Sequence, residues 1–220
     1  MKITVIIPVF NEINTIEQII NLVLDQKKFI LEVIIVDDCS IDGSKDILEK
    51  FKNYKNIKMI FHKKNKGKGG AIKSAVEHIS GEIVIIQDAD LEYDPKDYEK
   101  LVTPIINAET NVVYGSRVLG RTKKNFTVKE KFRIFANYFL TMISNIFNSN
   151  KLTDAHTCYK VFKTKIFKQL NLRENDFAFC PEVTTKLSKM KEKIIEVPIS
   201  YHGREYKEGK KIKTFDAIRA

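Results

Sequence analysis

Residues 82–94 read EIVIIQDADLEYD, and they combine the two features that decide the fold. The apolar run at 83–86 is typical of a strand buried on both faces of a parallel sheet. Four carboxylates follow it at every second position, at Asp88, Asp90, Glu92 and Asp94. Alternate side chains of an extended segment point the same way, so Asp88, Asp90 and Glu92 can converge where the loop curves. Such carboxylates repel one another unless a cation compensates, and Mg²⁺ or Mn²⁺ is the hard divalent ion that oxygen ligands favour.

Two other interpretations compete for this segment. The spacing of Asp88, Asp90 and Glu92 matches the first positions of a calcium EF-hand loop, but Tyr93 stands where that loop requires glycine and a strand precedes it. Asp94 followed by Pro95 is typical of a helix start, so we expect Asp94 to cap the next helix. The other three carboxylates remain available for a ligand.

The chain around this segment alternates strands with helices. Apolar runs at 3–10, 31–38 and 57–61 precede the one at 83–86, and helical patterns lie between them, which indicates a parallel sheet with crossover helices. A further short strand is expected at 111–117. Ligands bind at the carboxyl ends of the strands in such sheets, so the loops at 11–12, 37–40, 66–70 and 88–92 should converge.

The loop KGKGG at 66–70 resembles a phosphate-binding loop only in composition. It lacks the spacing of a P-loop, and no Ser or Thr follows its lysine, so a nucleotide triphosphatase is not indicated. The start of the following helix, with Lys68, can meet a diphosphate, and a plain tight turn explains the glycines equally well.

Length and charge suggest one domain with two unlike halves. The 220 residues, 43% of them hydrophobic, suit a single α/β domain. The net charge of +10 divides into −2 for residues 1–100 and +12 for residues 101–220, which favours a cation site in the first part and an anionic partner for the second. A solvated lysine-rich surface is the alternative explanation. Nucleic acid is not the expected partner, because no recognisable nucleic-acid-binding module is present.

The sequence predicts a cytoplasmic protein that can act at a membrane face. We expect no signal peptide and no membrane-spanning segment, and three cysteines without metal-ligand spacing are read as reduced. A helix predicted over 128–149 carries Phe132, Phe135, Phe139, Ile143, Ile146 and Phe147 on one stripe, preceded by a basic cluster. That combination suits an anionic membrane interface, while core packing is the competing interpretation of the stripe.

The motifs together resemble one enzyme family. ITVIIPVFNE, IIVDDCSIDGS, NKGKGGAIKSA, IVIIQDADLEYDP and VVYGSR occur in the order seen in family 2 glycosyltransferases, which have the nucleotide-diphosphosugar transferase (GT-A type) fold. TDAHTCYKVF, FCPEV, EVPISY and GREYKEGKKI resemble the branch of dolichol-phosphate mannosyltransferase and polyprenyl-phosphate glycosyltransferases. The resemblance covers nearly the whole chain and implies one catalytic domain, with residues 1–117 as the nucleotide-sugar and metal half and 118–220 as the acceptor half.

The resemblance also implies roles for individual residues. The nucleotide-sugar site would use Pro8, Phe10, Glu12, Val36, Asp38, Lys68, Asp88, Ala89 and Lys210, and the metal would be held by Asp90 and Glu92. The acceptor phosphate would be held by Arg117, Lys129 and Arg133. Arg204, with Lys210, would close over the donor diphosphate, so Asp90, Arg117 and Arg204 are the predicted catalytic residues.

The implied reaction is inverting transfer of a hexose from a GDP-mannose or UDP-glucose type donor to a polyprenyl or dolichyl phosphate. Cys158, within Thr157-Cys158-Tyr159, departs from the Ser-Gly-aromatic sequence of that branch, which leaves the role of Asp154 open. A soluble or polysaccharide hydroxyl acceptor would need a carboxylate base, for which Asp154 and Glu182 are the candidates. A non-catalytic nucleotide-sugar or membrane-binding module is the third alternative.

Overall fold

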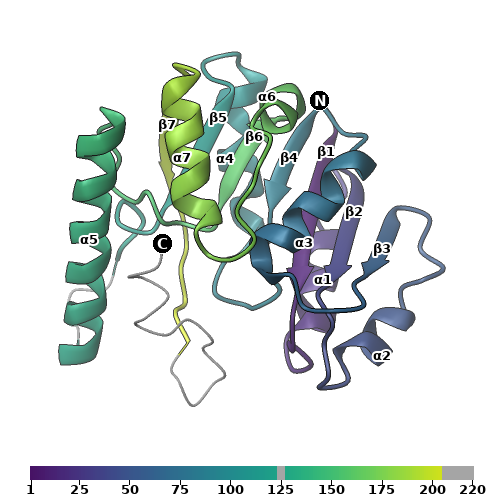
Figure 1. The fold of residues 1–220 in the computed structure, drawn as a ribbon. Helices are drawn as coiled ribbons and strands as arrows, with labels where there is room; N and C mark the ends of the chain where they lie inside the picture. The colour runs from purple at the N-terminus through teal and green to yellow at the C-terminus, as the bar shows by residue number, and fades with distance from the viewer. Residues whose placement is uncertain (123–126, 205–220) are drawn as a thin grey trace.

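A computed structural model describes residues 1–122 and 127–204, apart from the side chain of Lys129. The described residues form a seven-stranded sheet in the order β3-β2-β1-β4-β6-β5-β7 (Figure 1). The strands are β1 (Ile3–Val9), β2 (Ile30–Asp37), β3 (Ile57–Phe61), β4 (Ile83–Ile86), β5 (Val112–Ser116), β6 (Lys160–Lys163) and β7 (Ile194–Pro198). The expected α/β class with a mostly parallel sheet is confirmed.

Strand β6 is the exception to the parallel arrangement. It lies between β4 and β5 and is antiparallel to both, whereas the pairs β1/β2, β1/β4, β2/β3 and β5/β7 are parallel. Residues 160–162 end the motif TDAHTCYKVF, and the sequence does not predict a strand there. Because β5 and β7 pair along their length, both predicted halves of the chain contribute strands to one sheet.

Helices cover both faces of this sheet. They are α1 (Ile16–Leu24), α2 (Ser44–Glu49), α3 (Gly67–Ala75), α4 (Tyr98–Ile106), α5 (Val128–Asn148), α6 (Thr164–Gln169) and α7 (Phe179–Lys189), with short 3-10 turns at Val76–His78 and Pro95–Asp97. The sequence pattern predicts a helix over about 44–54, and α2 is shorter than that; it predicts another helix from Pro181, and α7 begins two residues earlier. Asp94 caps the turn at Pro95 by accepting a hydrogen bond from the backbone nitrogen of Lys96, as predicted.

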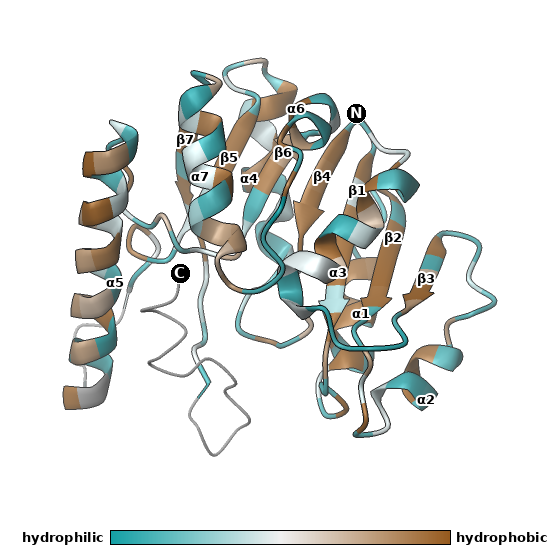
Figure 2. Cartoon of the chain, in the orientation of Figure 1, coloured by the Kyte–Doolittle hydropathy of each residue, from teal (hydrophilic) through white to brown (hydrophobic). Residues whose placement is uncertain are grey.

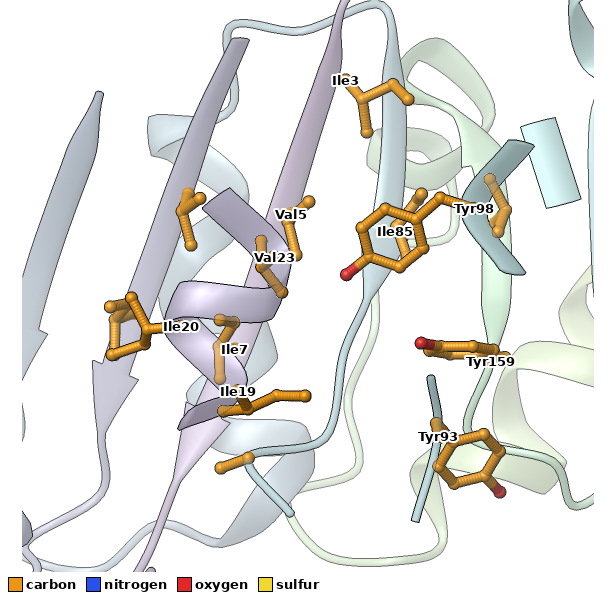
Figure 3. Packing of buried hydrophobic residues seen from close by; sticks show 14 of the residues in the cluster. Ile3, Val5, Ile7, Ile19, Ile20, Val23, Ile85, Tyr93, Tyr98 and Tyr159 are labelled. Carbon is orange, nitrogen blue, oxygen red and sulfur yellow. The ribbon is translucent and has the colours of Figure 1, made fainter. Parts of the chain in front are cut away.

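The alternation of side chains along β1 creates two apolar cores. Ile3, Val5 and Ile7 point to the face covered by α1, α2 and α4, and Figure 3 shows Val5 and Ile7 beside Val23 and Ile19 of α1. Ile6 points to the opposite face, where α3, α6 and α7 pack. Burial on both faces explains why the strands read as continuous apolar runs.

Helix α5 stands at the margin of the molecule, beside α7 (Figure 1). A capping box between Thr127 and Glu130 starts it, and Ser149 in a left-handed conformation ends it, so the predicted range of 128–149 is right to within a residue. Its buried side chains are polar: Thr141, Ser144 and Asn148. The expected polarity of a surface helix is therefore reversed, with the polar face against the protein.

The outer face of α5 is apolar (Figure 2). Phe132, Phe135 and Phe147 are 65%, 64% and 83% exposed. The core-packing interpretation of this stripe is wrong for the residues that lie in the open, whereas Ile143 is half-buried. None of the described helices has the length and apolarity needed to span a bilayer.

Candidate active site

The loops at the carboxyl ends of β1, β2 and β4 meet the start of α3 at one end of the sheet. The Thr15 hydroxyl, after β1, donates to the Ala89 carbonyl after β4 over 3.0 Å. Asp38, after β2, accepts the backbone N–H groups of Lys66 and Gly67 at 2.8 and 2.7 Å. The predicted convergence of these loops is therefore observed.

The glycines of KGKGG permit a close approach between backbone segments. Gly67 has a φ of +80°, which favours glycine, and a Cβ on Gly69 would lie 2.5 Å from the carbonyl oxygen of Glu174. Asp38 is 2% exposed and also contacts the ring of His62 at 2.6 Å. In this structure Asp38 anchors the loop, and its predicted contact with a nucleotide stays a prediction.

Lys68 crosses from α3 to the acidic loop. Its ammonium group donates to Asp88 and lies 3.1 Å from the sulfur of Cys158. Burial disfavours both charges, but each group compensates the other: the pKa of Lys68 is raised and that of Asp88 is lowered. Lys68 and Asp88, predicted as donor-site residues, are thus held as an ion pair.

Three carboxylates from two loops surround the guanidinium group of Arg204. The distances to Arg204 are 2.9 Å for Glu12, 2.8 Å for Asp90 and 3.9 Å for Glu92. The backbone nitrogen of Arg204 donates to Glu92 at 2.8 Å. Carboxylates this close need a positive charge between them, and Arg204 supplies it here.

Asp90 titrates abnormally in this cluster. Burial raises its pKa, the charges of Asp88 and Glu92 raise it further, and the attraction of Arg204 opposes them only in part, so its pKa is about 7. A carboxyl group that is only half ionised at neutral pH, beside two other acids, marks a place where additional positive charge is favourable.

The carboxylates suit a hard divalent cation in chemistry, but not as a complete set of ligands. Carboxylate oxygens are the ligands that Mg²⁺ and Mn²⁺ favour. Over residues 1–122 and 127–204, no group of three or more His, Cys, Asp or Glu side chains is arranged to hold a metal ion unaided. The predicted role of Asp90 and Glu92 as metal ligands stays a prediction.

A second charged group lies next to the carboxylates. Arg117 follows β5, and its guanidinium group is clamped by Asp154 through Nε at 2.7 Å and Nη2 at 2.8 Å. Asp154 is completely buried, and Arg117 is 21% exposed at its side chain. Asn137 of α5 contacts both side chains at 3.2 Å.

The charges of this pair fix its protonation. Burial would raise the pKa of Asp154, but the charge and hydrogen bonds of Arg117 outweigh it, so the pKa lies below its usual value. Glu196 of β7 holds the loop in place by accepting from the backbone nitrogens of Thr153 and Asp154 at 2.7 and 2.9 Å. Asp154 is therefore an ionised partner that positions Arg117.

Tyr201 joins the two charged groups. The guanidinium carbon of Arg117 lies 5.3 Å from the centre of the Tyr201 ring, and the Tyr201 hydroxyl donates to Glu92 at 2.8 Å. Sequence reasoning missed Asn137, Glu196 and Tyr201. The segment EVPISY containing the last two was noticed, but nothing in its pattern indicates what its side chains contact.

The remaining predicted site residues lie as follows. Phe10 is exposed, Pro8 is half-buried, Ala89 is buried in the acidic loop, and Val36 is fully buried against α3, so a contact from Val36 would have to use backbone atoms. Arg133 of α5 lies 3.4 Å from the carbonyl oxygen of Arg204. Lys210 and the Lys129 side chain lie outside the described parts of the chain.

Glu182, one of the two candidate bases, has a structural task. It accepts the backbone N–H groups of Arg173 and Glu174 at 2.7 and 3.0 Å and pairs with Lys186 at 2.7 Å. Those bonds hold the segment that packs against the glycines of α3.

A sheet of this topology, with an acidic loop after β4 and cationic side chains facing it, defines a glycosyltransferase of the GT-A type. The chain belongs to glycosyl transferase family 2, whose model matches residues 4–170. It is therefore a glycosyltransferase, as the motif resemblance implied.

Several named proteins are similar to it. The UDP-N-acetylglucosamine--dolichyl-phosphate N-acetylglucosaminyltransferase of Methanococcus voltae is 31% identical, over 93% of this chain and 87% of that protein. The dolichyl-phosphate beta-glucosyltransferase of Saccharomyces cerevisiae is 28% identical, over 91% of this chain and 66% of its own length. The ALG5A dolichyl-phosphate beta-glucosyltransferase of Trichomonas vaginalis is 26% identical, and the match spans 65% of it.

The fold is also found among solved structures. Glucosyl-3-phosphoglycerate synthase from Mycobacterium tuberculosis, solved with Mn²⁺, uridine diphosphate and glucosyl-3-phosphoglycerate, matches with a TM-score of 0.72 over 94% of this chain and 74% of that chain. The two sequences are 16% identical, so this likeness bears on the fold alone.

Proposed function

We propose that this glycosyltransferase moves a hexose from a nucleotide-diphosphate sugar, of the GDP-mannose or UDP-glucose type, to a polyprenyl or dolichyl phosphate with inversion. The observation that carries the proposal is the buried Arg117–Asp154 pair beside the carboxylates, with Tyr201 between them. A fixed guanidinium group next to a donor site suits an acceptor that brings its own negative charge. The relatives named for dolichyl-phosphate substrates support this choice.

The donor would lie between the acidic loop and α3. Glu12, Asp38, Asp88 and Ala89 would contact it from the loops that meet there, and Lys68 would contact it from α3. As the bond to the sugar breaks, negative charge develops on the leaving diphosphate, and the positive charges of Lys68 and Arg204 would stabilise it. Phe10, whose side chain is exposed, would cover the base.

The metal dependence belongs to the same proposal. Asp90 and Glu92 would hold Mg²⁺ or Mn²⁺, which supplies Lewis-acid stabilisation of the leaving diphosphate when bound. Arg204, which compensates these two carboxylates in the free protein, would then be released to contact the diphosphate, as predicted for it with Lys210.

A phosphate acceptor is a nucleophile without help from a base. Arg117, and Arg133 on the adjoining helix, need only hold the phosphate in line with the sugar carbon. A hydroxyl acceptor would instead require a base, and Asp154 is poorly suited to that task. It is completely buried, it is paired with Arg117, and its pKa is lowered. The hydroxyl acceptor and the non-catalytic module are therefore the weaker alternatives.

We further propose that the protein works at the cytoplasmic face of a membrane. The apolar outer face of α5 lies in the open and its first turns carry Lys131 and Arg133. Apolar rings next to basic side chains suit an anionic lipid surface, where the acceptor would be found.

The test is a panel of nucleotide sugars with Mn²⁺ and farnesyl phosphate, following the release of UDP or GDP with and without the acceptor. Release that depends on the lipid phosphate, and disappears with chelator, is the expected result. Slow hydrolysis that is indifferent to the phosphate acceptor would contradict the proposal.

A further inference from the structure

An apolar cavity lies next to Arg117 and has no task in the reaction described above. Its volume is about 410 Å³, within the range of small-molecule sites. Its wall consists of Val118 after β5, of Tyr138, Thr141, Met142, Asn145 and Ile146 on α5, and of Asn150, Leu152 and Thr153 in the loop that leads into β6.

The wall of the cavity includes chain neighbours of the Arg117–Asp154 pair and continues along α5. Val118 follows Arg117 and Thr153 precedes Asp154 in the chain. Tyr138 follows Asn137, whose side chain contacts the pair. From Tyr138 to Ile146 the helix rises about 12 Å. A molecule whose anionic end lies at Arg117 can therefore extend directly into the cavity.

The polar groups in the wall are mostly turned toward the protein. The Asn145 side chain both donates to the carbonyl and accepts from the nitrogen of Leu152, at 2.8 and 2.9 Å. The Thr153 hydroxyl bonds that of Ser116 at 2.7 Å. Thr141 accepts from the nitrogen of Ala155 at 3.3 Å. What these groups leave for a ligand is chiefly hydrocarbon surface, which suits neither a sugar nor a peptide backbone.

We infer that this cavity holds the first isoprenoid units of the acceptor, with its phosphate at Arg117. The assignment rests on the proposed function and adds a binding site for the lipid chain to it. Tyr138, Met142 and Ile146 belong both to the wall of the cavity and to the exposed apolar residues of α5. The chain would thus pass from the phosphate site to the apolar face of the helix without crossing a polar surface.

The experiment compares phosphates of increasing chain length, from dimethylallyl through geranyl to farnesyl phosphate. In the native protein KM should fall as the chain lengthens, because more apolar surface is buried. Met142→Trp fills the cavity and should raise KM for farnesyl phosphate at least ten-fold and flatten the series, with KM for the donor unchanged. Val128→Trp, at an exposed position of the same helix outside the wall, is the matched control and should stay within two-fold of the native value.

Asn150→Leu tests independently whether the occupant of the cavity is apolar. The Asn150 amide nitrogen is buried without a hydrogen-bond partner among the described residues. If the occupant is a hydrocarbon chain, a fully apolar wall should keep KM for farnesyl phosphate equal or lower it, whereas a higher KM would indicate a polar occupant. Should Met142→Trp fail to fold, Ile146→Trp fills the cavity from the next turn of the helix.

A binding measurement tests the lipid site in the cavity separately from sugar transfer. Equilibrium dialysis with farnesyl phosphate measures the site without turnover. Sugar transfer that is indifferent to chain length, and unaffected by filling the cavity, overturns the cavity assignment alone. Met142-dependent binding of farnesyl phosphate without transfer from any donor overturns the proposed reaction and leaves the cavity assignment standing.

Discussion

Asp154→Asn tests whether the buried carboxylate is a positioning residue or a base. Four donors converge on its two oxygens: the Arg117 backbone nitrogen and Nε on Oδ2, and Arg117 Nη2 and Asn137 Nδ2 on Oδ1. An asparagine offers one oxygen, so two of these donors lose their acceptor, each at about 1–3 kcal/mol. The charge of Arg117 is left without its partner as well, and breaking a buried ion pair costs about 3–5 kcal/mol.

The cost of the unsatisfied donors is already part of the cost of breaking the ion pair, so the free energy of unfolding should fall by about 3–5 kcal/mol in all. For a domain of this size each kcal/mol lowers Tm by about 2–4 °C, so Tm should fall by about 6–20 °C. The measurement is urea unfolding at pH 7. The pKa of Asp154 is lower in the folded protein than the value of about 3.9 in the unfolded chain. Its contribution to stability is therefore complete at pH 7, and it is lost only as the pH falls from about 3.9 through the folded pKa.

Two further variants sharpen the result. Asn137→Ala removes one of the four donors and should cost about 1 kcal/mol. Arg117→Met combined with Asp154→Leu removes both charges and should recover most of the stability lost in Asp154→Asn, since a buried ion pair replaced by apolar groups is often neutral. An Asp154→Asn variant that keeps its stability to within 1 kcal/mol but loses turnover would refute the positioning role and favour a base.

The remaining predictions concern pH, the acidic cluster, α5 and the glycine loop. Burial lowers the pKa of His156 to about 4, whereas in the unfolded chain the imidazole binds a proton below about pH 6.5. The free energy of unfolding should therefore fall by up to about 3 kcal/mol as the pH is lowered from about 6.5 to about 4. His156→Gln should make this decline smaller. Arg204→Met should strengthen Mn²⁺ binding to the donor-free protein, measured by calorimetry, while lowering turnover, because the cation no longer competes with the guanidinium group; weaker Mn²⁺ binding would contradict this arrangement. Replacing Phe135 and Phe139 with Ser should reduce binding to anionic vesicles at least ten-fold and leave Tm within about 2 °C, since both rings are exposed; a large drop in Tm would show that they pack in the core. Gly69→Ala should destabilise the fold by at least about 1 kcal/mol in urea unfolding, because its Cβ would lie 2.5 Å from a backbone oxygen.

Much of the fold could be predicted from local patterns. Apolar runs identified β1, β2, β3, β4 and β5, and the helix predicted from the apolar stripe agrees with α5 to within a residue. Strand β6 was missed because four residues, KVFK, carry too little periodicity to be distinguished from a loop. Its antiparallel place between β4 and β5 depends on contacts between segments about 50 to 80 residues apart in the chain.

The candidate site was predictable to a similar extent. The acidic loop, Lys68, Arg117 and Arg204 were identified from motifs, and the structure brings them together on one side of the sheet. The partners that orient them were not identified, because Asn137 and Tyr201 are ordinary residues in sequence. Only their positions next to Arg117 give them a role.

The sequence by itself determined the α/β class, the spacing of the carboxylates and the apolar stripe of α5. These are local properties, since side-chain direction along one strand or helix follows from the backbone repeat. Tertiary structure alone decided that Asp154 clamps Arg117, that Arg204 compensates Glu12, and that α5 turns its polar face inward. Each of these depends on which distant segments pack together, and a repeat within one element carries no information about the surface it meets.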